Sequence, residues 1–324
     1  MVRVALVGCG MALVVGCDDG EPAKGAPAEP TWPPPPSAFL APTAYDCSAT
    51  SPIEPPPRPH DPGCFHDPTC AAPLVASHRI ATPFAPENSL SALRAAILLG
   101  VDIVETDLRL TADGHVVIIH DDTVDRTLEG SGEVEQLTLD ELRALPMRVP
   151  ATLPAGDFSC DRVPVLGELL DLAEGRIIVE LEVKDSEAGV LAAEHLRDGG
   201  LWDGAFLLCD PSECAAIRAA VPDAPIMTRP ESADEVAAAL SYTPPPIMVH
   251  IDPFSDFLNE PVVEAIHSVG AKVYANAFLM ADVQALTAGR FEAYVEMYDA
   301  GLDVVQTEFP HWALTGLGRQ APAQ

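Results

Sequence analysis

Two histidines, an arginine and several carboxylates lie close together in the stretch from His78 to His120. Most of these polar residues stand at the ends of apolar runs, where a solvated loop would have no need of them. Glu105 and Asp107 belong to one such run, which reads as a buried strand over residues 101–107. Side chains alternate along a strand, so these two carboxylates share a face. Two adjacent carboxylates need a cation in order to coexist in their charged forms.

His120 ends a second predicted strand, over residues 116–120. The intervening sequence LTADG is too short for a crossover helix, which takes about a dozen residues or more. If Asp113 and Gly114 form a two-residue hairpin turn, strand pairing places Asp107 directly opposite His120. If the two strands are instead parallel, His120 still reaches the same cleft at the strand ends.

Glu182 and Lys184 form a second charged pair, at the end of the apolar run RIIVELEV over residues 176–183. The chain has only three lysines. A lysine that lies beside carboxylates at a strand end is therefore expected to do more than keep the surface soluble. Carboxylates together with water suit a hard divalent cation. The alternative interpretation is a buried structural ion pair.

Further short motifs follow one another in order along the chain. They are His78-Arg79, Pro86-Glu87-Asn88, Glu105-x-Asp107, the TADG turn, His120-Asp121, Asp125-Arg126-Thr127, Gly130-x-Gly132 and the TLDEL segment. This ordered set resembles the glycerophosphodiester phosphodiesterase family, within the PLC-like phosphodiesterase superfamily. The resemblance covers residues 74–310, more thinly toward the end.

The chain departs from the family pattern at three places. Ile80 stands where the family usually has glycine after His-Arg. The family's Trp-Thr-Val-Asn and Thr-Asp-x-Pro segments appear as Tyr274-Ala275-Asn276-Ala277 and Thr307-Glu308-Phe309-Pro310.

Imidazole titrates near neutral pH, which suits it to general acid and base catalysis. We therefore predict that His78 and His120 share these two roles. Arg79 presents a planar guanidinium that can clamp a phosphate. The resemblance makes Lys184 a second phosphate contact, and it places Glu87 near the metal as a further residue of the substrate site.

The resemblance also implies that Glu182 joins Glu105 and Asp107 as the third metal carboxylate. The expected cofactor is one divalent cation, Ca²⁺ or Mg²⁺, which would neutralise a phosphate oxygen and activate a nucleophilic hydroxyl or water. The predicted function is hydrolysis of glycerophosphodiesters to sn-glycerol 3-phosphate and an alcohol. Two alternatives stay open: a sphingomyelinase D-like phosphodiesterase of phospholipid headgroups, and a catalytically inactive barrel lipoprotein that binds a ligand.

Other polar residues are given structural roles. Glu180 shares a strand face with Glu182 and is expected deeper in the fold. Asn88 and Ser89 precede a predicted helix and are expected to cap it. His250 lies in an apolar strand and is expected to be a core residue.

The elements that must position these residues alternate along the chain. Strand-like runs lie at 74–78, 101–107, 116–120, 176–183, 205–209, 225–228, 247–251, 271–275 and 303–307. Helical patterns lie at 90–99, 187–198, 211–220, 231–240, 260–269 and 280–299. This alternation, over about 230 residues, predicts an α/β fold, a (β/α)8 TIM-type barrel. The barrel domain is placed at 74–312 and a C-terminal tail at 313–324, and one of the nine strands must be peripheral.

Residues 1–16 combine an early arginine with an apolar run shorter than the about 20 residues of a transmembrane helix. This is the pattern of a signal peptide. Val14-Val15-Gly16-Cys17 resembles the processing site of bacterial lipoproteins, with Cys17 as the lipidated residue. The alternatives are an ordinary signal peptide cut elsewhere, or a buried first strand. We therefore predict an exported protein, either anchored through Cys17 in the bacterial cell envelope or secreted.

Residues 17–73 are rich in proline, alanine and acidic residues, which predicts an extended linker. Cys47, Cys64 and Cys70 lie in its second half and predict that this half is pinned to the barrel by disulfides. The pairing stays open, although a stapled loop around Cys64 and Cys70 is favoured over a metal site. Cys209 lies in an apolar strand and is expected to be a buried free thiol.

The net charge of −31 limits which kinds of molecule this protein can bind. Such an acidic surface repels nucleic acid and anionic membranes at long range. No segment resembles a nucleic-acid-binding module. The expected partner is a small glycerophosphodiester or a lysophospholipid-like substrate, and an anionic phosphodiester requires a local positive site.

Overall fold

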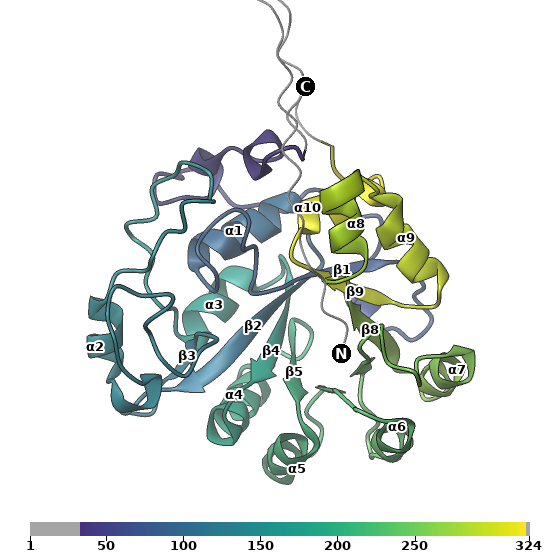
Figure 1. The fold of residues 1–324 in the computed structure, drawn as a ribbon. Helices are drawn as coiled ribbons and strands as arrows, with labels where there is room; N and C mark the ends of the chain where they lie inside the picture. The colour runs from purple at the N-terminus through teal and green to yellow at the C-terminus, as the bar shows by residue number, and fades with distance from the viewer. Residues whose placement is uncertain (1–32, 322–324) are drawn as a thin grey trace, which may run out of the picture. The chain divides into compact units, whose positions relative to one another are not determined.

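Eight parallel strands close into a barrel in the computed structural model, which describes residues 33–321 (Figure 1). Their order is β1-β9-β8-β7-β6-β5-β4-β2, and pairing of β1 with β2 closes the ring. The strands are β1 (Leu74–Ser77), β2 (Ile103–Leu110), β4 (Ile178–Val183), β5 (Ala205–Cys209), β6 (Ile226–Thr228), β7 (Met248–His250), β8 (Lys272–Asn276) and β9 (Val304–Thr307). The predicted TIM-type barrel is confirmed. The predicted signal peptide and Cys17 lie outside the described residues.

Helices surround the barrel (Figure 1). They are α1 (Leu90–Leu99), α2 (Leu139–Ala144), α3 (Leu166–Ala173), α4 (Ser186–Gly199), α5 (Pro211–Ala220), α6 (Ala233–Leu240), α7 (Glu260–Ser268), α8 (Ala281–Ala288), α9 (Glu292–Asp299) and α10 (Pro310–Gly316). The single helix predicted over 280–299 is instead the pair α8 and α9. Gly289 ends α8 with a φ of 67°, a left-handed conformation that closes a helix. Within residues 33–321, no helix is long and apolar enough to cross a membrane.

The peripheral ninth strand is β3 (Val116–Ile118), which pairs antiparallel with β2. Leu108 lies opposite Ile118, so Asp107 lies opposite Ile119. The N–H of Ile119 donates to the Asp107 carbonyl at 3.0 Å. The register that would place Asp107 opposite His120 is therefore wrong by one residue. The loop has three residues rather than two, because Thr111 N–H donates to the His115 carbonyl across it.

The barrel interior is apolar at its base and polar toward the carboxyl ends of the strands. Ile178 belongs to an apolar cluster with Ile103 and Phe206. Glu180 and Glu182 follow Ile178 at alternate positions on β4, so all three side chains point into the barrel. Each lies nearer the carboxyl end of the strand than the one before it. This alternation brings acidic side chains to the end of the barrel where TIM-barrel enzymes have their active sites.

Three disulfides are present among the described residues: Cys47–Cys160, Cys64–Cys70 and Cys209–Cys214. The first ties the linker to the segment between β3 and α3, and the second forms the expected stapled loop. The prediction that Cys209 is a free thiol is wrong. Helix α5 begins at Pro211, directly after β5, and its first turn brings the Cα of Cys214 within 5.3 Å of that of Cys209.

Asp102, buried before β2, joins the linker to the C-terminal segment. Its carboxylate accepts hydrogen bonds from Arg319 at 2.6 and 2.8 Å and from Val75 N–H at 2.8 Å, and it lies 3.0 Å from Nε2 of His60. Burial alone would raise the pKa of Asp102, but the bonds from His60 and Arg319 outweigh burial and lower it. Helix α10 and Arg319 thus continue the packing of the barrel beyond residue 312.

Candidate active site

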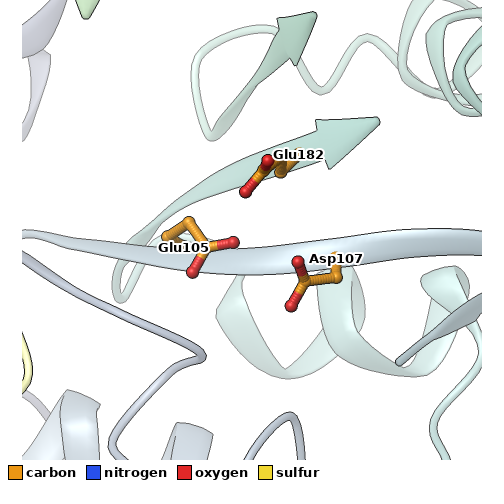
Figure 2. A group of neighbouring side chains, drawn as sticks. All are labelled: Glu105, Asp107 and Glu182. Atoms are coloured by element: carbon orange, nitrogen blue, oxygen red, sulfur yellow. The ribbon is translucent and has the colours of Figure 1, made fainter. Parts of the chain in front are cut away.

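Three carboxylates meet at the carboxyl ends of two adjacent barrel strands. Glu105 and Asp107 lie on β2, and the parallel register places Glu182 of β4 beside Asp107. One carboxylate oxygen from each of the three lies within 4.8 Å of the others. Figure 2 shows Glu105 and Asp107 on one strand and Glu182 on its neighbour. The predicted metal ligands therefore form a single cluster.

This cluster carries more negative than positive charge. Burial, and then the neighbouring carboxylates of Asp107 and Glu182, raise the pKa of Glu105 well above its usual value. Lys184 offsets part of the charge, since its Nζ donates to Glu182 at 2.7 Å and lies 3.3 Å from Asp107. Burial would raise the pKa of Glu182, but the Lys184 ammonium outweighs it and lowers that pKa.

The donor set fits a hard divalent cation. Oε1 of Glu105 and Oδ1 of Asn88 are buried and have no hydrogen-bond partner among the described residues. Buried oxygens in this state are uncommon, because leaving them unsatisfied costs free energy. Carboxylate and amide oxygens are the ligands that Ca²⁺ and Mg²⁺ take. Glu105, Asp107 and Glu182 would hold such an ion, and the Asn88 amide lies beside them.

Asn88 was expected to cap a helix and does not. Ser89 caps α1 instead, with its hydroxyl accepting from Ala92 N–H at 3.0 Å. Asn88 has a φ of 55°, a left-handed conformation that asparagine tolerates. Its Nδ2 donates to Oδ2 of Asp107 at 2.9 Å, so it orients a carboxylate of the cluster. The sequence signal was its place in the Pro-Glu-Asn motif.

His78 follows β1 at the edge of the acidic cluster. Its Nδ1 lies 2.6 Å from Oε1 of Glu308, and its Nε2 lies 3.9 Å from Oε2 of Glu105. Because a carboxylate accepts, Nδ1 is the protonated nitrogen in this pair. Burial would raise the pKa of Glu308, but the hydrogen bond from His78 outweighs it and lowers that pKa. This bond fixes the ring with Nε2 toward the cluster.

His120 is held in the same way by its neighbour in sequence. Its Nδ1 lies 2.6 Å from Oδ1 of Asp121. Arg126 donates to the same carboxylate at 2.6 and 3.0 Å. The Arg126 bond is the main reason that the pKa of Asp121 is far below its usual value. Both histidines thus leave Nε2 available for proton transfer.

Four cationic side chains surround this site: Arg79, Arg126, Lys184 and Arg229. Glu87 links two of them, accepting from Arg79 at 3.2 Å and from Arg126 at 2.6 and 2.8 Å. Among the described residues, the hydrogen bonds of Glu87 are therefore to arginines rather than to the acidic cluster. Arg126 was not predicted as a site residue, although it stands in the Asp-Arg-Thr motif.

Arg229 was also missed. It directly follows β6, and its Nη1 lies 3.9 Å from Oε1 of Glu182. Its only sequence signal was its position one residue beyond the predicted strand 225–228.

The departure at Ile80 has a structural basis. Ile80 has a φ of 77°, which glycine adopts freely and a β-branched residue adopts rarely. Its side chain is nevertheless fully buried, and its N–H donates to the Glu105 carbonyl at 2.9 Å. The neighbouring N–H of Arg79 donates to Oε2 of Glu105 at 2.8 Å. The turn is thus built with isoleucine in place of glycine, and it still meets the cluster.

Glu180 and His250 lie below this site. Both are buried in the barrel, as expected. Burial raises the pKa of Glu180 to about 8 and lowers the pKa of His250 well below its usual value. Burial therefore favours the neutral form of each side chain.

Comparison with known proteins finds relatives over part of this chain. A glycerophosphodiester phosphodiesterase of Caldanaerobacter subterraneus subsp. tengcongensis is 41% identical over 113 residues, which are 34% of this chain and 45% of that protein. The chain spans about half the length of the curated relatives it matches.

Solved structures extend the likeness across the barrel. A glycerophosphoryl diester phosphodiesterase from Parabacteroides distasonis has a TM-score of 0.64 and 23% identity, covering 79% of this chain and 90% of that one. An Oleispira antarctica phosphodiesterase, in complex with the product sn-glycerol-3-phosphate, has a TM-score of 0.61 and 25% identity, covering 76% of this chain and 97% of that one. Residues 78–310 match the Glycerophosphoryl diester phosphodiesterase family, and the chain belongs to this family.

Proposed function

We propose that this protein hydrolyses glycerophosphodiesters to sn-glycerol 3-phosphate and an alcohol. One arrangement carries the proposal: His78 and His120 are each held at Nδ1 by a carboxylate, and both lie near the cluster of three carboxylates. His78 lies 3.9 Å from Glu105, and the charge of His120 contributes to lowering the pKa of Glu182. The family supports it, as does the related phosphodiesterase with bound sn-glycerol-3-phosphate.

The cationic side chains would bind the phosphodiester. Arg79 offers a planar guanidinium and Lys184 an ammonium at the edge of the acidic cluster. Together they supply the local positive charge that an anionic substrate needs against a net charge of −31. Arg126, held by Glu87 and Asp121, would extend this surface.

The two histidines would move the protons. One histidine accepts, at Nε2, the proton of the water or hydroxyl that attacks phosphorus. As the new P–O bond forms, the P–O bond to the alcohol breaks, and the other histidine gives its Nε2 proton to the departing oxygen. Glu308 and Asp121 would stabilise the imidazolium forms.

A divalent cation at Glu105, Asp107 and Glu182 would supply charge neutralisation at a phosphate oxygen and would lower the pKa of the nucleophile. The alternation of strand side chains places these ligands, while Asn88 and Lys184 hold two of them in position.

The test is an assay of glycerophosphocholine and sphingomyelin with metal, with chelator, and with metal restored. We expect glycerophosphocholine to be cleaved, chelator to abolish turnover and metal to restore it. Turnover of sphingomyelin alone would favour a headgroup phosphodiesterase. Absence of turnover on both substrates, with metal present, would refute the proposed activity.

We also propose that the protein is exported and that Cys17 carries a lipid anchor. Three disulfides support export, because such bonds persist in oxidising compartments. Cys17→Ser should release the protein from the membrane phase in a detergent partition, and Cys9→Ser should not. Equal retention of both variants would refute the anchor.

A further inference from the structure

Arg229 brings an unused guanidinium group to the edge of the carboxylate cluster. It directly follows β6, and its side chain is 44% exposed. Its one ion pair among the described residues is with Oε1 of Glu182, and at 3.9 Å this contact is too long for a hydrogen bond. Lys184 already donates to that oxygen at 2.7 Å. The donors of Arg229 are therefore available to a ligand.

The other cationic side chains of the site are paired more closely. Arg79, Arg126 and Lys184 each donate a hydrogen bond to a carboxylate. Within residues 33–321, Arg229 is the one of these four cations that donates none. A guanidinium presents its N–H groups in a planar fork that matches a carboxylate or a phosphate. An anionic group of the ligand is thus the partner that suits Arg229.

The place of Arg229 in the barrel indicates which part of a phosphodiester it meets. The carboxylate cluster lies on β2 and β4, and His78 and Arg79 follow β1. In the order of the strands these elements belong to one side of the ring, and β5, β6, β7 and β8 make up the other side. A phosphodiester has two organic substituents, which extend from phosphorus in different directions. With the phosphate at the cluster, a substituent that extends toward β6 meets Arg229.

Acidic residues stand beyond the ends of the two strands beside β6. Asp210 directly follows β5, and Asp252 lies two residues beyond β7. Both side chains are exposed. These charges disfavour a substituent that carries a further phosphate, and they favour one whose negative group is accompanied by an ammonium. An amino acid with a hydroxyl group, such as serine, is a small alcohol that combines a carboxylate with an ammonium.

We propose that Arg229 binds the carboxylate of the alcohol and so makes glycerophosphoserine a better substrate than diesters whose alcohol lacks a carboxylate. The inference rests on the proposed function and names a specificity-determining residue for it. In the alternative interpretation, Arg229 only offsets the negative charge of the cluster. It would then affect every glycerophosphodiester alike.

The test compares glycerophosphoserine with glycerophosphoethanolamine, which differs from it only by lacking the carboxylate. The variants are Arg229→Gln, which removes the charge, and Arg229→Lys, which keeps the charge but loses the planar fork. The matched control is Arg197→Gln. The Arg197 side chain is 41% exposed, and it lies in the last turn of α4, outside the candidate active site.

The quantity measured is the ratio of kcat/KM for glycerophosphoserine to kcat/KM for glycerophosphoethanolamine. An effect of Arg229 on the cluster is common to both substrates and cancels in this ratio. The ratio should exceed one in the wild type, and Arg229→Gln should lower it by about tenfold or more, because a hydrogen-bonded pair of charged groups is lost. Arg229→Lys should lower the ratio less, and Arg197→Gln should leave it unchanged.

A wild-type ratio of one or less, or a ratio that Arg229→Gln leaves unchanged, overturns the inference. Cleavage of either diester leaves the proposed function standing in that case.

A binding measurement separates the two proposals if neither diester is cleaved. In isothermal titration calorimetry, the wild type and Arg197→Gln should bind glycerophosphoserine more tightly than glycerophosphoethanolamine, and Arg229→Gln should bind the two equally. That result would retain Arg229 as a carboxylate-binding residue while the proposed hydrolysis fails. Equal binding of the two diesters by the wild type, or no binding, would overturn the inference as well.

Discussion

Nδ1 of His78 and Oε1 of Glu308 lie 2.6 Å apart, although 230 residues separate them in sequence. The contact exists because β1 and β9 are adjacent parallel strands, so that the residues just after each strand meet. Asp282 of α8 supports Glu308 from behind, accepting from its N–H at 3.0 Å. The orientation of His78, a proposed catalytic residue, thus depends on the closure of the barrel.

Glu308→Gln should lower kcat and leave KM for glycerophosphocholine nearly unchanged, because the carboxylate orients His78 and is not proposed to touch the phosphate. The loss should be smaller than the about 10²–10⁴-fold expected for His78→Ala. Steady-state kinetics of both variants would check this. A loss in Glu308→Gln as large as in His78→Ala, accompanied by raised KM, would contradict a positioning role.

His78→Ala and His120→Ala should differ in their response to the leaving group. The general acid protonates the departing oxygen, so its loss matters less when p-nitrophenol leaves. Loss of the general base should slow both substrates alike. Turnover of glycerophosphocholine and of a p-nitrophenyl diester by each variant would assign the roles. Near wild-type turnover by both variants would rule out the two-histidine mechanism.

Glu105→Gln should weaken the binding of Ca²⁺ or Mg²⁺ without unfolding the protein, since glutamine has nearly the same shape and burial already raises the pKa of this carboxyl. In the wild type, saturation at about 100 times Kd should add about 2.7 kcal/mol to the free energy of unfolding. Denaturation with and without metal measures this gain. Glu187→Gln, at an exposed residue outside the cluster, serves as the control. An unchanged metal-dependent gain in Glu105→Gln would contradict the site.

Asp102→Asn should destabilise the barrel by about 3–5 kcal/mol, because it removes the partner of buried cationic side chains. Asp198→Asn, at an exposed ion pair with Arg197, should leave the free energy of unfolding nearly unchanged. Urea denaturation of both variants and the wild type gives the comparison. Equal stability of all three proteins would contradict the role assigned to Asp102.

Asp102 and His60, which form a hydrogen bond, should make the stability of the fold depend on pH in opposite ways. The pKa of Asp102 is lower in the folded protein than in the unfolded chain, where it is about 3.9. Its contribution to the free energy of unfolding is therefore present above about pH 3.9 and is lost as the pH falls through the folded-state pKa. The hydrogen bond to Asp102 raises the pKa of His60 above its unfolded-state value of about 6.5. The contribution of His60 to the free energy of unfolding is therefore complete below about pH 6.5 and is lost as the pH rises through the folded-state pKa. The difference in stability between the wild type and His60→Ala should therefore be larger at pH 5 than at pH 9.

The pairing of Glu105 with Asp107 in the carboxylate cluster could be predicted from the sequence because strand alternation is local. Glu105 and Asp107 share a face wherever the strand lies. Glu182 was predicted to join them through the resemblance to the family, and β4 places it beside Asp107. Arg79 was predicted from its guanidinium beside His78, and Lys184 from the resemblance to the family.

Contacts that depend on loop geometry or barrel closure could not be predicted. One added loop residue changes the strand register, which is why Asp107 does not face His120. Glu308 meets His78 only when the first and last strands pair. Cys214 meets Cys209 because α5 starts directly after β5, a boundary that sequence patterns do not fix to within a residue.

The Cys47–Cys160 disulfide gives the linker a second attachment to the barrel, and this changes how the molecule carries mechanical tension. A pull on the chain before Cys47 crosses the disulfide to Cys160 and bypasses residues 48–159. That bypassed loop contains most of the proposed site, namely His78, Arg79, Glu87, Glu105, Asp107 and His120. With the disulfide reduced, the same pull runs along the linker into β1, whose last residue directly precedes His78. The bond therefore keeps a load on the N-terminal segment out of β1 and β2.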